Sequence, residues 1–164
     1  MASRLPAGCR YVLWLDPGLI TGWALYYVED EKLFTDEYEF DELCWRLENW
    51  CATAGRDTVI GVERFTLTSK SWQYRDAYTA LYAIGAARSA ASRHGAIRFL
   101  DGTTSSAGLA LGSDEVLRTC GWYSTTLGHA NDAARHVGSY LTSVDCAPRA
   151  WTDSIRTLLE NQEY

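Results

Sequence analysis

Several features are absent from this sequence of 164 residues, and each absence excludes a class of protein. No apolar run approaches the roughly 20 residues that a membrane-spanning helix needs. The opening segment, Met-Ala-Ser-Arg-Leu-Pro-Ala-Gly, lacks the apolar centre of a secretory signal, and no internal repeat or low-complexity linker is present. We therefore expect a cytoplasmic protein in which residues 1–164 form a single domain.

The sequence also lacks a Cys-x-x-Cys pair. Its five cysteines are odd in number and lie at Cys9, Cys44, Cys51, Cys120 and Cys146. This pattern does not suit a disulfide framework or a structural zinc site. We interpret all five residues as buried or incidental thiols in a reducing compartment.

Positive charge is scarce, because 15 Lys and Arg face 21 Asp and Glu, for a net charge of -6. Taken alone, this balance argues against a nucleic-acid partner. The charge is segregated, however: residues 29–57 hold ten acidic and three basic side chains, whereas residues 64–98 hold six basic ones and one acidic one. The middle of the chain therefore supplies either a positive binding surface or a basic helix face that only confers solubility.

The order of the apolar segments predicts an α/β fold. The continuous run from Tyr11 to Leu15 is typical of a strand buried on both faces. The expected strands cover residues 11–15, 22–28, 32–40, 58–62 and 96–100, and the expected helices cover residues 40–54, 72–94, 113–119, 128–142 and 148–160. We predict a mixed five-stranded sheet, with three antiparallel strands and then two parallel ones, flanked by helices.

Two of the expected strands end in carboxylates. Asp16 ends the first strand directly before the Pro17-Gly18 turn, and Glu63 ends the fourth. If these strands are adjacent and parallel, both side chains emerge at the carboxyl edge of the sheet, where α/β proteins place their chemistry. Two close carboxylates raise each other's pKa unless a cation lies between them. The alternatives are that Asp16 caps the turn and that Glu63 pairs with Arg64 or another basic residue.

A further set of ligand-type residues lies on the helix expected at residues 128–142. His129, Asp132 and His136 are spaced three and four apart, so they share a stripe beside the apolar face of that helix. We interpret His129 and Asp132 as candidate ligands, with a plain polar or solvated role as the alternative for each. His136 is interpreted as a bystander because it lies one turn further along, and Asp101 as a turn acid.

These residue types predict metal-dependent hydrolysis. Carboxylate oxygens with one imidazole suit Mg²⁺ or Mn²⁺ better than a thiolate-seeking metal. Two such ions about 4 Å apart activate a water and stabilise the leaving oxygen of a phosphodiester. We therefore expect a site with two ions that acts on a phosphodiester.

Three motifs together resemble the RuvC-type Holliday junction resolvases. Leu15-Asp16-Pro17-Gly18 with Thr21-Gly22-Trp23-Ala24 resembles the opening motif of that family, Val62-Glu63 its second acidic motif, and His129-Ala-Asn-Asp132-Ala-Ala its last motif. The resemblance covers residues 10–143, whereas the helical extension at about 148–162 has no counterpart that we can assign. The small size and the high tryptophan content would suit a phage-encoded member, acting in the host cytoplasm.

The resemblance implies an RNase H-like fold and a homodimeric, Mg²⁺- or Mn²⁺-dependent endonuclease that acts on four-way DNA in recombination and repair. It implies that Asp16, Glu63, His129 and Asp132 are the catalytic metal ligands. The family carries lysines between its fifth strand and its last motif, but residues 102–127 here hold only one basic residue. The expected DNA contacts are therefore Arg64, Phe65, Lys70, Trp72, Arg75 and Arg118, with aromatic rings available for stacking.

Three other functions are compatible with parts of the pattern. A different RNase H-like nuclease, such as the YqgF-type group, would act on RNA, and a related enzyme would cut flap DNA. An ATPase of the actin and sugar kinase type needs two such domains, for which 164 residues are too few. A catalytically silent, nucleic-acid-binding dimer of the same fold is the third alternative.

Overall fold

The computed structural model describes residues 4–65, 75–102 and 112–161. Five strands form one sheet in the order β3-β2-β1-β4-β5. They are β1 (Tyr11–Asp16), β2 (Ile20–Tyr27), β3 (Lys32–Glu39), β4 (Thr58–Glu63) and β5 (Arg98–Gly102). The β1–β2 and β2–β3 pairs are antiparallel, whereas the β1–β4 and β4–β5 pairs are parallel. The predicted mixed sheet is therefore confirmed.

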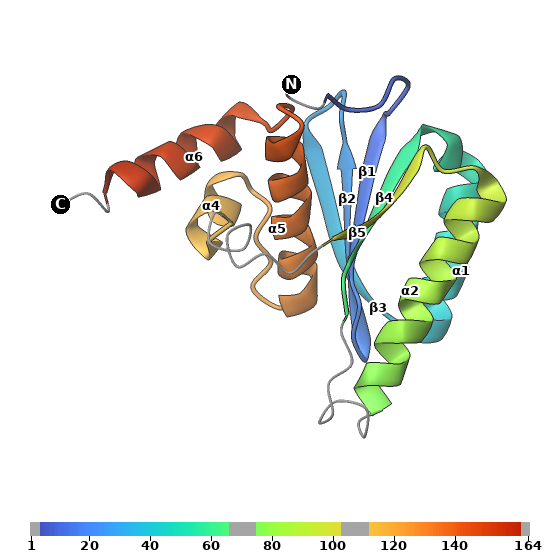
Figure 1. Ribbon diagram of the computed structural model, residues 1–164. Coiled ribbons are helices and arrows are strands. Elements are labelled where there is room, and N and C mark those ends of the chain that lie inside the picture. The colour runs from blue at the N-terminus through green and yellow to red at the C-terminus, as the bar shows by residue number, and fades with distance from the viewer. Residues whose placement is uncertain (1–3, 66–74, 103–111, 162–164) are drawn as a thin grey trace.

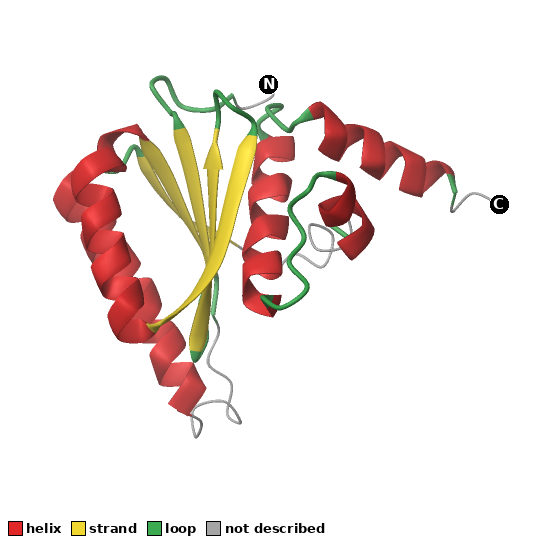
Figure 2. Cartoon of the chain, turned by 180° about the vertical axis from the view of Figure 1, so that it is seen from behind, coloured by secondary structure: helices red, strands yellow, loops and turns green. Residues whose placement is uncertain are grey.

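Helices cover both faces of the sheet (Figure 1), as the view from behind also shows (Figure 2). One face carries α1 (Phe40–Ala54), which runs into the short helix η1 (Gly55–Asp57), and α2 (Arg75–His94). The other face carries α5 (Gly128–Ser143), and α4 (Asp114–Thr119) and α6 (Arg149–Glu160) lie beyond it. Within the described ranges, no helix has the length and apolar character to span a membrane.

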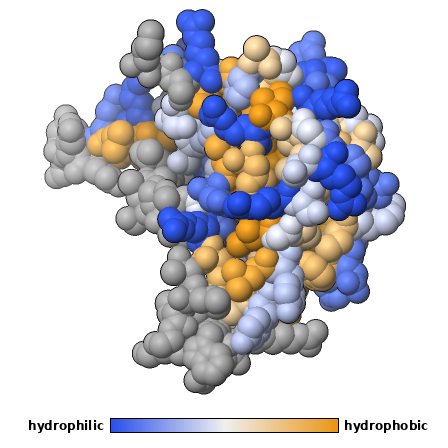
Figure 3. Space-filling model, turned by 45° about the vertical axis from the view of Figure 1, so that its right-hand side comes forward, coloured by the Kyte–Doolittle hydropathy of each residue, from blue (hydrophilic) through white to orange (hydrophobic). Residues whose placement is uncertain are grey.

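The outer surface on the α1 and α2 side is partly apolar. Figure 3 brings this side forward and shows apolar patches between polar regions. A groove of about 640 Å³ is lined by Leu19, Ile20, Phe40, Tyr78 and Tyr82, together with the polar residues Glu39, Asp41 and Thr79. Four of these five large side chains are well exposed, with Tyr82 at 62% the most so. Contiguous exposed apolar surface of this kind is typical of interaction sites.

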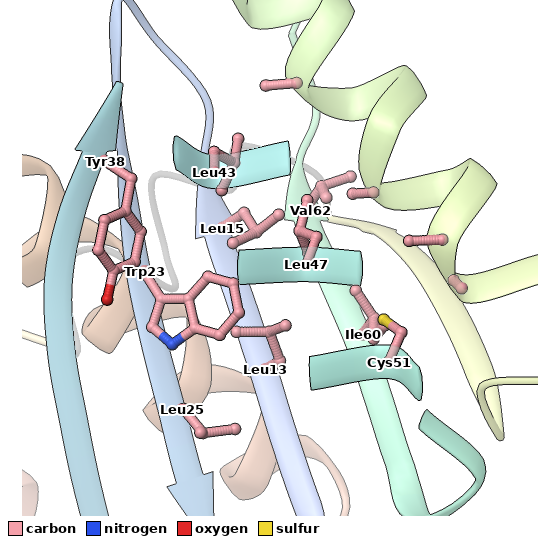
Figure 4. Close-up of a cluster of buried hydrophobic side chains, with 14 residues drawn as sticks. Leu13, Leu15, Trp23, Leu25, Tyr38, Leu43, Leu47, Cys51, Ile60 and Val62 are labelled. Atoms are coloured by element: carbon pink, nitrogen blue, oxygen red, sulfur yellow. The ribbon is translucent and has the colours of Figure 1, made fainter. Parts of the chain in front are cut away.

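The apolar run of β1 supplies two cores, because successive side chains of a strand point to opposite faces. Leu13 and Leu15 pack under α1 and α2, in the cluster that Figure 4 shows. Val12 and Trp14 pack against α5 on the other face. The same alternation places Asp16 on the α5 face of the sheet.

Strand β4 alternates in the same way. Its side chains Ile60 and Val62 belong to the core under α1 and α2. Glu63 therefore faces α5, as Asp16 does. The periodicity of two strands thus directs both strand-end carboxylates toward the helix that carries the third motif.

The C-terminal helix α6 docks through one tryptophan. Trp151 is completely buried, and its ring stacks on Trp122 with centroids 5.3 Å apart. Its indole N–H donates to the hydroxyl of Thr142 at 3.0 Å. Gly138 on α5 makes room for the ring, because a β-carbon there would lie 2.3 Å from it. This contact joins the expected C-terminal extension to α5.

Candidate active site

Asp16 and Glu63 emerge next to each other from adjacent parallel strands. Leu15 pairs with Val62 in the β1–β4 register, so the residue that follows each of them stands at the carboxyl edge of the sheet. Both side chains are sheltered, with exposed fractions of 12% for Asp16 and 20% for Glu63. The two carboxylates were expected to meet if their strands are adjacent and parallel, and β1 and β4 are both.

The two carboxylates interact strongly. Burial and hydrogen bonding to Glu63 raise the pKa of Asp16 to about 7, against a partial opposing effect of His129. The pKa of Glu63 is lowered instead, mainly by the neighbouring imidazole of His136. The opposite shifts are typical of two neighbouring carboxyl groups in unequal surroundings, one more deeply buried and the other beside an imidazole.

His129 reaches Asp16 from the first turn of α5. Its Nδ1 lies 2.8 Å from Oδ2 of Asp16. Burial lowers the pKa of His129, but the carboxylates of Asp16, Glu37 and Asp132 outweigh this effect, so its pKa is raised overall. His129 is half exposed, which leaves part of its ring open to solvent.

Gly22 allows α5 to approach this closely. It pairs with Asp16 across the β1–β2 register, and a β-carbon on Gly22 would lie 2.0 Å from the carbonyl oxygen of His129. The backbone of α5 thus fills the space above Gly22 that a side chain would otherwise occupy.

Two polar residues that the sequence reasoning missed hold the start of α5. The backbone N–H of Ala130 donates to Glu37 on β3 at 3.1 Å, which satisfies one of the free N–H groups of the first turn. Asn131 is buried and exchanges two hydrogen bonds of 2.8 Å with the backbone of Ser124. No sequence pattern predicts either contact, because each side chain bonds to a backbone group outside its own strand or helix.

His136 is not a bystander. Its Nε2 lies 3.3 Å from Oε2 of Glu63, and its ring stacks on Trp14 with centroids 5.6 Å apart. The Nε2 atom is fully buried, but the approach lacks the direction of a well-formed hydrogen bond, so we treat the contact as electrostatic. The helical spacing correctly placed His136 on one face of the helix with Asp132. Its position one turn further along α5 did not keep it from Glu63, which it contacts.

Asp132 is turned away from the carboxylate pair. Its Oδ1 forms an ion pair with Arg135 one turn later on α5. The same guanidinium pairs with Asp114 on α4 and donates to the backbone carbonyl of Gly112 at 2.7 Å. The expectation that Asp132 joins Asp16 and Glu63 is therefore not met in this arrangement, because a cation within the chain already neutralises it.

Within residues 4–65, 75–102 and 112–161, no three His, Cys, Asp or Glu side chains are arranged to hold a metal ion. The predicted four-ligand cluster is thus not preassembled, since His129 bonds directly to Asp16 and Asp132 bonds to Arg135. The donor types still fit Mg²⁺ or Mn²⁺, which prefer oxygen ligands. Burial is the largest cause of the raised pKa of Asp16, and the neighbouring carboxylate of Glu63 adds to it.

The expected DNA contacts are only partly described. Arg64 is exposed and Phe65 half-buried directly after Glu63, whereas Lys70 and Trp72 lie outside the described residues. Arg75 is the first residue of α2, and nothing is described of its side chain. Arg118 is exposed on α4, where its guanidinium lies 4.0 Å from the ring centroid of Tyr123.

The segregated positive charge is partly neutralised. Arg88 pairs with Asp101 at 2.6 Å, so Asp101 is an ion-pair partner and not a plain turn acid. Arg93 pairs with Glu48 of the acidic segment at 3.3 Å. These two arginines of α2 therefore contribute less free positive charge than the sequence indicated.

The fold has counterparts among solved structures. The structure of Thermus thermophilus RuvC in complex with a Holliday junction substrate superposes with a TM-score of 0.61 at 17% identity, over 84% of this chain and 97% of that one. The chain has a RuvC-like fold. A second T. thermophilus RuvC structure gives a TM-score of 0.60 at 17% identity, over 84% of this chain and 98% of that one.

The likeness to RuvC lies in the fold. No protein-family model matches the sequence, and a sequence comparison with curated proteins finds no match. The part of the chain that superposes includes the sheet, in which β1 and β4 run parallel and end side by side. The resemblance seen in three short motifs is confirmed at the level of the fold.

Proposed function

We propose that this protein is a divalent-metal-dependent endonuclease that hydrolyses phosphodiesters in branched DNA, with the four-way junction as its preferred substrate. The observation that carries the proposal is the convergence of Asp16, Glu63 and His129 from β1, β4 and α5. Two sheltered carboxylates beside an imidazole form a hydrolytic centre with a strong demand for positive charge.

In this proposal Asp16, Glu63, His129 and Asp132 hold Mg²⁺ or Mn²⁺, in two sites. Bound metal would supply a nucleophilic water and stabilise the leaving oxygen. Asp16 would hold the metal as a carboxylate, and His129 would lie at the metal or the phosphate. Asp132 must leave Arg135 to take part, so the ion pair on α5 opposes assembly of the site.

We propose that DNA is bound by Arg64, Phe65, Lys70, Trp72, Arg75 and Arg118. Arg64 and Phe65 directly follow Glu63, which supports their contact with the strand being cut.

We also propose a homodimer over residues 1–164. The apolar groove between Ile20 and Tyr82 supports it, since the carboxylates of Glu39 and Asp41 at its edge disfavour DNA there. Light scattering on the purified protein measures the mass directly.

A catalytically silent DNA-binding protein is the second candidate, favoured by one observation. Asp132 is engaged by Arg135 together with Asp114, which is the arrangement of a structural ion-pair network. In that case the protein would bind branched DNA without cutting it.

The deciding experiment incubates the protein with labelled four-way, flap and linear duplex DNA and with RNA, in Mg²⁺ or in EDTA. We expect cleavage of the four-way junction in Mg²⁺ only. Asp16→Asn should lower the rate more than about a hundredfold, since even outer partners of metal ligands are worth 10- to 100-fold. Asp153→Asn on α6 is the control, because it removes a carboxylate far from β1 that pairs with Arg149.

Each alternative has its own outcome. Junction binding without cleavage favours the silent protein, and preferential cleavage of RNA or flaps favours another RNase H-like nuclease. An Asp16→Asn variant that cuts as fast as the parent would contradict the assigned site.

A further inference from the structure

His136 occupies an unusual position for a histidine. It is 7% exposed in the middle of α5, and within the described chain its buried Nε2 has no hydrogen-bond partner. The nearest charged atom is Oε2 of Glu63, at 3.3 Å. A buried polar atom is costly unless something compensates it, so a histidine aimed at a carboxylate points to a role that an apolar residue would not fill.

Trp14 holds the ring of His136 in place. The two rings are nearly parallel, with an interplanar angle of 8° and centroids 5.6 Å apart. Trp14 is itself 5% exposed, and its indole N–H has no hydrogen-bond partner in the described part of the chain. Among the described residues, packing and not hydrogen bonding holds the indole, and the indole in turn supports the imidazole.

Two glycines form the shelf on which Trp14 lies. A β-carbon on Gly61 of β4 would lie 2.3 Å from the indole, and one on Gly102 of β5 would lie 2.6 Å from it. Gly61 is the register partner of Trp14, and Gly102 is the register partner of Glu63. The absence of side chains at these two positions lets the indole lie flat across both strands, directly beneath the α5 residues that face Glu63.

We propose that His136 is a positioning residue for Glu63, held against that carboxylate by Trp14 on the Gly61–Gly102 shelf. Glu63 needs such support because it is the last residue of β4 and its side chain has three rotatable bonds. A neighbour that restricts the rotamers of a metal ligand raises metal affinity, because the ligand is already held close to the geometry that the metal requires. His136 meets this carboxylate at 3.3 Å and, unlike His129 beside Asp16, is not one of the proposed metal ligands.

This inference rests on the proposed nuclease function, and two variants test it. His136→Phe keeps a flat ring to stack on Trp14 but removes Nε2. His136→Gln loses the stack but restores a donor near Glu63. We expect His136→Phe to lower kcat on four-way DNA by about 10- to 100-fold and to weaken Mn²⁺ binding without DNA by a similar factor, with KM unchanged. His136→Gln should recover part of both losses.

His94→Phe is the matched control for His136→Phe. His94 contacts Glu48 with its Nε2 at 2.7 Å and is also sheltered, but this pair links α2 to α1 on the opposite face of the sheet. Loss of a His–Glu contact as such should therefore affect both variants in thermal unfolding. Only the change at His136 should affect Mn²⁺ binding and kcat.

A spectroscopic measurement on the parent chain separates this inference from the proposed function. The ring nitrogen shifts of His136, recorded by NMR at one pH in the absence of metal, should move in Glu63→Gln and stay in place in Glu48→Gln. Unmoved His136 shifts overturn the inference whatever the enzyme does. So does a His136→Phe variant with the Mn²⁺ affinity and kcat of the parent. A parent protein that cuts no DNA overturns the proposed function, and the NMR shifts then still decide whether His136 and Glu63 are coupled.

Discussion

The imidazole of His129 lies 2.8 Å from the carboxylate of Asp16, although 113 positions separate the two residues in the sequence. The contact joins the first strand of the sheet to the helix that packs across it. It exists because Gly22 carries no side chain at the point where the backbone of His129 crosses β2.

Folding stability should depend on the protonation of Asp16. Its pKa rises from 3.8 to about 7 on folding, so the folded protein binds this proton more tightly than the unfolded chain does. The free energy of unfolding should therefore fall as pH rises from about 4 toward 7, by up to about 1.4 kcal/mol per pH unit for one proton.

Urea unfolding at a series of pH values in EDTA checks this, with Asp16→Asn as the comparison. His129, which contacts Asp16, stays largely protonated between about pH 4 and 6, because an imidazole in the unfolded chain has a pKa near 6.5 and folding raises the pKa of His129. The difference between parent and variant in this range therefore reports Asp16. The variant should gain stability relative to the parent as pH rises. A difference that does not change with pH would show that folding does not raise the pKa of Asp16.

Gly22→Ala should damage the site. The added methyl group meets backbone atoms of α5, which cannot rotate away as a side chain can. We expect a loss of about 1–3 kcal/mol in the free energy of unfolding and a large loss of cleavage, because His129 is displaced from Asp16. Thermal unfolding and the junction assay measure the two effects.

Gly85→Ala is the matched control for that substitution. Gly85 lies within α2, and a β-carbon there meets no atom within 4 Å. Alanine at this position should stabilise the protein by up to about 1 kcal/mol and leave cleavage unchanged. Equal behaviour of the two variants would argue against a close approach of α5 to β2.

Asp132→Asn and Asp114→Asn separate a ligand from a structural acid. Both substitutions remove one carboxylate from Arg135, and both side chains are nearly half exposed, at 44% and 45%. Each should therefore cost less than about 1 kcal/mol of stability. Only Asp132→Asn should lower the cleavage rate, by more than about tenfold. If both variants cut DNA at the parental rate, Asp132 is a structural residue only.

Trp151→Ala should loosen α6. The side chain is completely buried between α5 and Trp122, and truncation of such a residue costs about 3–5 kcal/mol. Leu159→Ala in the same helix removes a side chain that is 54% exposed and should change stability by less than about 0.5 kcal/mol. Equilibrium denaturation of both variants makes the comparison. A small effect at Trp151 would show that α6 does not depend on this anchor.

Local pattern was enough to predict the elements of this fold. The unbroken apolar run of β1 indicated burial on both faces, and the 3.6-residue repeat of α1 and α5 indicated amphipathic helices. The ends of β1 and β4 were identifiable because each apolar run stops at a carboxylate, Asp16 or Glu63. The spacing of His129 and Asp132 was equally readable, since residues on one helix face recur at fixed intervals.

Contacts between elements were not readable in this way. The pair of Asp132 and Arg135 lies within one helix at a spacing of three residues, whereas nothing in the local sequence indicates that His136 touches Glu63. The contact of His136 depends on how α5 is rotated and how closely it packs. Both are determined by Gly22, Gly61 and Gly102, whose role is to leave room for atoms from other segments.

The sequence by itself therefore determined which residues stand at strand ends and on helix faces, because periodicity follows from backbone geometry alone. Only the tertiary structure decided which of those residues meet. Asp16 lies against His129 and Glu63 against His136, because the packing of α5 on the sheet brings these residues together. The pair of Asp132 and Arg135 lies within α5, and the tertiary structure added Asp114 of α4 to it.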